Sequence, residues 1–222
     1  MTALKIDFVS DIACPWCAVG LGALEKALSN LDGKVKADLH FQPFELNPTM
    51  GPEGQDITEH ITQKYGISEA QAEANRAVIR ERGAALGFTF SGTNANGGGR
   101  SRTYNTFDAH RLLHWAHTVG ADKQKALKEG LFKAYFTEGE SPASRDVLIK
   151  VAQFAGLDPV RAAEILDSDE FAMEVRESEQ FYQSQGIHSV PAVIINDRHL
   201  ISGGQPVEVF EQALRQIAQA SA

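Results

Sequence analysis

The chain has 222 residues, of which 43% are hydrophobic and 23% charged, and its formal net charge is −8. This composition is that of a globular protein of one or two domains. The negative charge argues against a nucleic-acid partner, because phosphate binding requires a basic surface. No apolar run reaches the roughly 18 residues that a membrane helix needs. Met1 is not followed by the pattern of a secretory leader, so we expect a cytoplasmic protein with no membrane partner.

The amino-terminal part is typical of a strand, a helix and a second strand. Residues 4–9 predict the first strand, and leucines at helical spacing predict a helix over 14–31, which Asp32 and Gly33 end. Residues 35–41 alternate apolar and polar side chains, which indicates the second strand. A strand, a helix and a strand in this order favour parallel pairing.

The middle of the chain, from about residue 56 to 185, shows helix-start signals and no convincing strand. Ser68 and Gln71 form a capping box. The other helices are expected to start at or near Thr58, Tyr104, Asp122, Ser144, Asp158 and Ser168. A glycine-rich stretch over 89–102 indicates a loop.

The carboxy-terminal part returns to strands. Residues 192–195 and 199–202 predict two strands joined by a turn, and Pro206 opens an amphipathic final helix. The two ends of the chain would together form a four-stranded sheet with helices on both faces. We therefore predict a sheet domain over 1–55 and 186–222, with a helical insertion over 56–185.

The two cysteines of the chain are both found in Cys14-Pro15-Trp16-Cys17, where a strand gives way to a helix. This position and spacing are typical of a redox motif. A helix N-terminus favours a thiolate, so Cys14 is the expected nucleophile, at least partly exposed, and Cys17, one turn deeper, the resolving thiol. In the cytosol such a pair is expected to be catalytic, because thiol buffers reduce static disulfides.

Zinc binding by the two cysteines is the alternative. Zinc usually takes four ligands, and nothing in the sequence places His110 and His114, which are four residues apart, beside Cys17. We therefore expect no metal. The glycines at 97–99 lack the strand–turn–helix context of a phosphate or dinucleotide loop, so no nucleotide or flavin is expected either.

The order of elements, with CPWC at the head of the first helix, resembles the thioredoxin fold, an α/β fold of βαβ and ββα halves. The large all-helical insertion resembles the DsbA-like branch, and within it the FrnE-like proteins. The segments that carry this resemblance are Ser10–Asp11 with Cys14–Cys17, Phe44–Pro48, Asn105–Thr106 with Ala109–Arg111, Gly186–Ile187 with Ser189–Pro191, and Ser202–Pro206.

Related isomerases of 2-hydroxychromene-2-carboxylate and kappa-class glutathione transferases typically have serine where this chain has Cys14. The cysteine therefore favours redox chemistry. Some FrnE-like proteins have a second cysteine pair, which this chain lacks. We therefore expect this chain to use no mechanism that needs a second disulfide of its own.

The resemblance implies that Pro191 is cis and faces the cysteines; from the sequence alone, a trans proline at a strand start is the alternative. The backbone of Val190 would then pair with an extended substrate. Pro15 suits the first helical turn, and Trp16 is interpreted as an exposed apolar plate beside Cys14, with packing as its alternative.

Four further residues have two interpretations each. Phe44 lines the apolar rim of an active-site cleft beside the cysteines, or packs in the core. His110 contacts a substrate or the Cys14 thiolate, or is structural. Asp7 relays the Cys17 proton from beneath the pair, or points to solvent. Asp11 is interpreted as a loop residue or helix cap.

We therefore expect a thiol–disulfide oxidoreductase that exchanges a Cys14–Cys17 disulfide with protein or small-molecule thiols, with no bound cofactor and with glutathione as a candidate co-substrate. One alternative is a glutathione-dependent isomerase or transferase that acts on an aromatic metabolite and uses Cys14 without redox turnover. Another is a scaffold or chaperone that is indifferent to both cysteines. The sequence leaves open the direction of exchange, the substrate and whether the protein is a homodimer.

Overall fold

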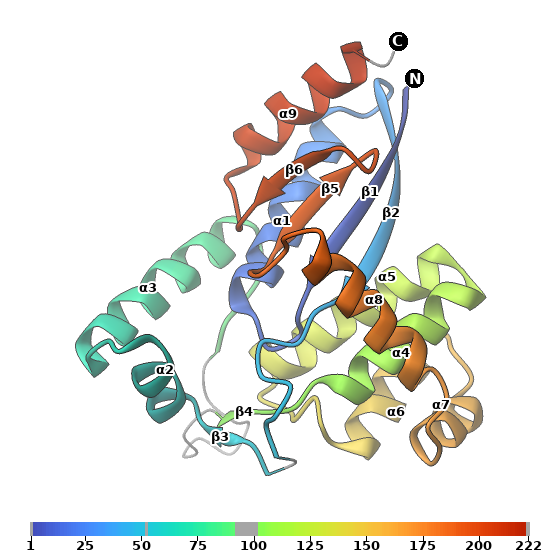
Figure 1. Ribbon diagram of the computed structural model, residues 1–222. Coiled ribbons are helices and arrows are strands. Elements are labelled where there is room, and N and C mark those ends of the chain that lie inside the picture. Colours follow the sequence, from blue (N-terminus) through green and yellow to red (C-terminus); the bar gives the residue numbers. More distant parts are fainter. Residues whose placement is uncertain (1, 52, 92–101, 221–222) are drawn as a thin grey trace.

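The computed structural model describes residues 2–51, 53–91 and 102–220, and its centre is a four-stranded sheet in the order β2-β1-β5-β6 (Figure 1). The strands are β1 (Thr2–Ser10), β2 (Val35–Pro43), β5 (Ala192–Ile195) and β6 (His199–Ser202). All four predicted strands are thus confirmed. Most of the loop expected over 89–102 lies outside the described residues.

The pairing of the strands follows from the chain order. α1 (Pro15–Asn30) crosses between β1 and β2, which lie parallel, with Phe8 opposite Phe41. β5 is antiparallel to β1, and a tight turn returns the chain as β6, antiparallel to β5. The predicted parallel pair is therefore confirmed. β1 contributes to the core on both of its faces.

The helices between the two sheet segments are α2 (Ile57–Tyr65), α3 (Glu69–Ala85), α4 (Phe107–Val119), α5 (Ala121–Phe132), η1 (Lys133–Thr137), α6 (Arg145–Phe154), α7 (Pro159–Leu166) and α8 (Ala172–Ser184); α9 (Val207–Ala220) ends the chain. The capping box of Ser68 and Gln71 is present at the start of α3.

Several local expectations were wrong. Asp56, not Thr58, caps α2, because its carboxylate accepts hydrogen bonds from the backbone of Thr58 and Glu59. The middle of the chain also contains two strands of two residues each, β3 (Gln55–Asp56) and β4 (Arg102–Thr103), which are too short to leave an alternating pattern. α4 begins at Phe107, later than predicted.

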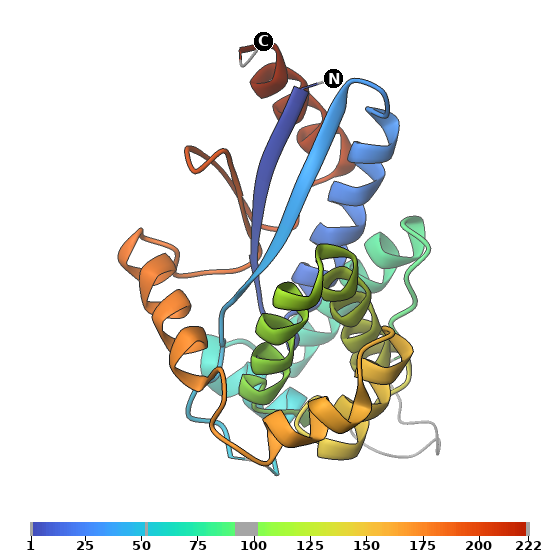
Figure 2. The ribbon, with the colours of Figure 1, turned by 90° about the vertical axis from the view of Figure 1, so that its right-hand side faces the viewer.

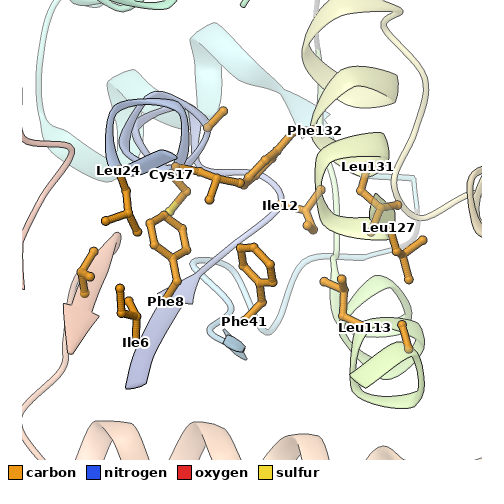
Figure 3. Close-up of a cluster of buried hydrophobic side chains, with 14 of the residues drawn as sticks. Ile6, Phe8, Ile12, Cys17, Leu24, Phe41, Leu113, Leu127, Leu131 and Phe132 are labelled. Atoms are coloured by element: carbon orange, nitrogen blue, oxygen red, sulfur yellow. The ribbon is translucent and has the colours of Figure 1, made fainter. Parts of the chain in front are cut away.

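The main core runs from the sheet into the helical insertion. Phe8 and Phe41 lie edge to face, with ring centroids 5.9 Å apart. Figure 3 shows Cys17 beside Phe8 and Phe132, with the α4 and α5 side chains Leu113, Leu127 and Leu131 continuing the cluster. Cys17 thus lies where the sheet, α1 and the insertion meet. The division of the chain into two domains stays a prediction.

A second cluster covers the opposite face of the sheet. Figure 2 shows α1 and α8 on opposite sides of the strands. Tyr182 of α8 packs there with Val9, Phe44, Ile187 and Ala192. Because successive strand residues alternate in direction, Asp7 and Val9 face α8 whereas Phe8 faces α1. Within the described residues, no helix is long and apolar enough to cross a membrane.

Candidate active site

The two cysteines occupy the first turn of α1. Cys14 is the residue that precedes the helix, with extended backbone (φ −92°, ψ 110°), and its carbonyl accepts a hydrogen bond of 3.0 Å from the Cys17 N–H. Pro15 begins the helix, and at this position the N–H that proline lacks would have no partner within the helix. Cys14 therefore sits at the end of the helix whose dipole favours a negative charge.

Both thiols are buried and free, with 5% of Cys14 and none of Cys17 exposed. The expectation that Cys14 is partly exposed was wrong. The Cys14 thiol points toward the Val190–Pro191 loop, and its Sγ lies 3.6 Å from the carbonyl oxygen of Val190. Burial raises the pKa of the Cys17 thiol well above its usual value, and a hydrogen bond with Cys14 raises it further. Cys17 therefore keeps its proton in the dithiol state.

The Val190–Pro191 peptide bond is cis, as the resemblance implied. The carbonyl of Pro191 accepts a hydrogen bond of 2.8 Å from Gly203, which ties this loop to the turn before α9. Gly20 of α1 lies directly beneath the proline ring: a Cβ added there would be 3.0 Å from Pro191 Cγ. The Val190–Pro191 loop is thus held between α1 and the Gly203 turn.

Trp16 is half-buried and packed, and so is less exposed than the predicted apolar plate. The Arg82 guanidinium lies 5.1 Å from the ring centroid. Gly204 approaches so closely that a Cβ would be 2.9 Å from the Trp16 carbonyl oxygen. The structure therefore supports the packing role of Trp16, and the exposed part of its side chain lies two residues after Cys14.

The contact between α1 and Pro191 can be tested with two glycines of the same helix. Gly22→Ala is expected to stabilise the protein by about 0.5–1 kcal/mol, because alanine favours helix and the new Cβ meets Leu86 at an ordinary 3.6 Å. Gly20→Ala gains the same helix propensity but presses on Pro191, so we expect a net loss of about 1–2 kcal/mol in urea denaturation. Equal stabilisation by both substitutions would show that Pro191 is not tightly held.

Asp11 organises the loop between β1 and α1 from a fully buried position. One carboxylate oxygen accepts hydrogen bonds from the Ala13 N–H (3.1 Å) and the Thr106 hydroxyl (2.7 Å), and the other accepts from the Leu46 N–H (2.7 Å). Burial alone would raise the pKa of Asp11, but interactions with His110 and these donors hold it below its usual value. Asp11 is therefore ionised, and its carboxylate connects the start of α1 to Leu46 and Thr106. This is a larger structural role than that of the loop residue or helix cap that the sequence predicted.

The other predicted site residues lie apart from the Cys14 thiol. Phe44 is 7% exposed and packs in the second cluster, which supports its core interpretation. His110 is 2% exposed, and its Nε2 lies 3.6 Å from Asp11 Oδ1 rather than against Cys14. Asp7 is neither solvent-exposed nor beneath the cysteines. It accepts a hydrogen bond of 2.7 Å from Gln42 and pairs with Lys5 at 3.1 Å on the α8 face.

Two lysines near the cysteines were not among the predicted site residues. Lys64 Nζ donates hydrogen bonds to the Leu46 carbonyl (2.7 Å) and Asn47 (2.8 Å), and it interacts electrostatically with Cys14. Lys128 is completely buried and interacts electrostatically with Cys17. The sequence held one signal, since Lys128 shares a face of its helix with Leu131 and Phe132. Among the described residues, no three His, Cys, Asp or Glu side chains are grouped to hold a metal ion.

A dithiol at the start of the first helix, facing a cis-proline loop on a four-stranded mixed sheet, is the arrangement of a thioredoxin-type fold with a CXXC pair. The model of the DSBA-like thioredoxin domain matches residues 5–215. The chain therefore belongs to the DSBA-like thioredoxin family, and its fold is the α/β thioredoxin fold with a helical insertion.

Three known proteins illustrate the similarity. The crystal structure of a probable DsbA oxidoreductase from Streptomyces coelicolor is 32% identical, with a TM-score of 0.87 over 99% of this chain and 91% of that one. The uncharacterised protein YwbO of Bacillus subtilis is 27% identical over 95% of this chain and 96% of its own length. A 2-hydroxychromene-2-carboxylate isomerase has a TM-score of 0.70 over 97% of each chain, and at 15% identity it shows the shared fold alone.

Proposed function

We propose that the protein is a thiol–disulfide oxidoreductase that works through a mixed disulfide at Cys14. The observation that carries the proposal is the position of the Cys14 thiol, at the head of α1 and 3.6 Å from the Val190 carbonyl before the cis-proline. A thiolate there would be favoured by the helix dipole and would lie beside a backbone segment able to pair with an extended chain.

The two thiols would have different roles in the reaction. Cys14 would attack a substrate disulfide, and Cys17, which is buried beneath it, would release the bound half by attacking Cys14. Substrates would be protein or small-molecule thiols and disulfides, with glutathione as a co-substrate and no resident cofactor. Trp16 and Val190 would provide the surface around the reacting sulfur. Membership of the FrnE-like branch and a cytoplasmic location are parts of the same proposal.

The first experiment is a redox titration. The protein would be equilibrated in glutathione buffers of graded potential, and the state of the two cysteines read by mass after alkylation. We expect a reversible two-electron transition between about −270 and −120 mV, the range of this fold. The midpoint would say whether the protein tends to oxidise or to reduce its partners.

Two other results would contradict the proposal. One is that no internal disulfide forms at any potential. The other is a stable glutathione adduct at Cys14 with no transition to the internal disulfide, which would favour a glutathione-dependent isomerase or transferase.

A further inference from the structure

Lys128 of α5 is a buried cation that packing does not explain. Its side chain has no exposed surface, and Nζ finds no hydrogen-bond acceptor among the described residues. It lies 4.9 Å from the centroid of the Phe132 ring. An ammonium group without hydrogen-bond partners is costly inside a protein. A methionine would fill the same space without that cost, so a function is the natural reason for the lysine.

The surroundings of Lys128 point to the redox pair. Its charge interacts electrostatically with Cys17, Asp11 and Cys14. The ring of Phe132, above which Nζ lies, packs beside Cys17 in the core (Figure 3). Lys128 thus approaches the buried thiol from the helical insertion, whereas the substrate would approach Cys14 from the side of Val190.

A cavity with polar and apolar walls lies next to Lys128. Its volume is about 150 Å³, which is room for several water molecules. His110, His114 and His117 line it from one face of α4 and are buried, half-buried and exposed in that order. His110 Nε2, like Lys128 Nζ, has no hydrogen-bond partner among the described residues. The cavity therefore offers a path for protons from Lys128 to the surface.

The titratable groups that surround Lys128 are Cys14, Cys17 and Asp11 from the start of α1 and His110, His114 and His117 from α4. The rest of the cavity wall is uncharged, and it consists of Phe41, Gln42 and Pro43 from β2, Leu113 from α4, Gln124 from α5 and Ser178 from α8.

The carboxylates near the sheet are poorly placed to take a proton from Cys17. Asp11 has its oxygens occupied by three donors, and its pKa is held below the usual value. Asp7 lies on the other face of the sheet, with Gln42 and Lys5. Of the titratable side chains considered as proton acceptors, Lys128 therefore combines an electrostatic interaction with Cys17 and a cavity that leads toward solvent.

We propose that Lys128 is the base that accepts the proton of Cys17 when this thiol resolves the mixed disulfide, and that the cavity exchanges that proton with solvent. The inference rests on the proposed function. Cys17 S–H gives its proton to the Lys128 amine, directly or through one water molecule. The Cys17 thiolate attacks Cys14 Sγ, the Cys14–Cys17 bond forms, and the bond from Cys14 to the substrate sulfur breaks. The substrate leaves as a thiolate and takes a proton from solvent, and Lys128 releases its own into the cavity.

The charge state of Lys128 suits this step. Burial lowers the pKa of Lys128 to about 8, so the neutral amine is accessible near neutral pH, where a base is most effective. In the reverse direction, the ammonium would protonate Cys17 as it leaves the internal disulfide.

Reaction with the disulfide of thionitrobenzoate isolates the step. Attack by Cys14 releases one equivalent of thionitrobenzoate, and attack by Cys17 on the mixed disulfide releases a second. In Lys128→Met we expect the first release to be unchanged and the second to be about 10²- to 10⁴-fold slower at neutral pH. Lys128→Arg keeps the charge but cannot act as a base, so it is expected to lose the wild-type rise of the second phase toward pH 8. Lys125→Met, on the same helix in partly exposed ion pairs with Glu25 and Glu129, is the matched control.

Thermal unfolding separates function from structure. Because Lys128→Met removes an unpaired buried charge, we expect its Tm to equal or exceed that of the wild type. A second phase in Lys128→Met within threefold of the wild type, with the same pH profile, would overturn the inference, and so would a slow phase accompanied by a marked loss of Tm in both Lys128 variants. If the wild type itself releases only one equivalent, the proposed function has failed instead.

Discussion

Replacing Cys17 with serine is expected to stop turnover after one half-reaction and to leave the substrate bound to Cys14. Cys14 keeps its position before α1 and beside Val190, so it should still attack a disulfide. Nothing then releases the product, because serine is not a nucleophile toward disulfides under these conditions. Intact-mass measurement should show one adduct per chain, and multiple turnover should fall to the uncatalysed rate.

Cys14→Ser is the matched control, since it differs by the same single atom. It should form no adduct, because Cys17 is completely buried. Full turnover by Cys17→Ser on a glutathione-dependent isomerisation would contradict the redox cycle and favour the isomerase alternative. Activity that is indifferent to both substitutions would favour a scaffold or chaperone.

The order of strands and helices could be predicted because its signals are local. Alternation over 35–41, the leucines of the first helix and the capping box of Ser68 each depend on neighbouring residues. The cis form of the Val190–Pro191 bond was predicted from the resemblance, since the local sequence alone favours a trans proline at a strand start. The pairing of the amino-terminal and carboxy-terminal strands in one sheet could also be predicted, because two strands alone do not form a stable sheet.

The environment of the redox pair could not be predicted, because it depends on contacts across long stretches of chain. Asp11 is bound by Leu46 and by Thr106, which lies 95 residues away. Lys128 interacts electrostatically with Cys17 although it belongs to the insertion, and a hydrophobic pattern does not reveal that a lysine on the apolar face of α5 is fully buried. The alternation of β1 separates Asp7 from Phe8, but only the structure shows that α1 covers Phe8 while α8 covers Asp7.

Because of the same long-range contacts, we expect Asp11 to contribute strongly to stability near the site. Asp11→Asn keeps the size of the side chain but removes the charge and replaces one acceptor oxygen with a donor. The Leu46 and Ala13 N–H groups and the Thr106 hydroxyl then compete for a single acceptor. Leaving a buried donor without its partner costs about 1–3 kcal/mol. We therefore expect a loss of about 2–4 kcal/mol at neutral pH, measured by urea denaturation, and slower attack by Cys14.

The dependence of this loss on pH provides the sharper test. The folded pKa of Asp11 lies below its ordinary value, so its ionisation stabilises the fold above the ordinary pKa of about 4, and this stabilisation is lost as the pH falls through the lower, folded pKa. The difference in unfolding free energy between the wild type and Asp11→Asn should therefore be constant at neutral pH and shrink in acid. Asp38→Asn, on an exposed side chain paired with His40, should change stability little at neutral pH. A loss in Asp11→Asn that is equal at neutral and acid pH would mean that its hydrogen bonds, and not its charge, hold the loop that carries Cys14.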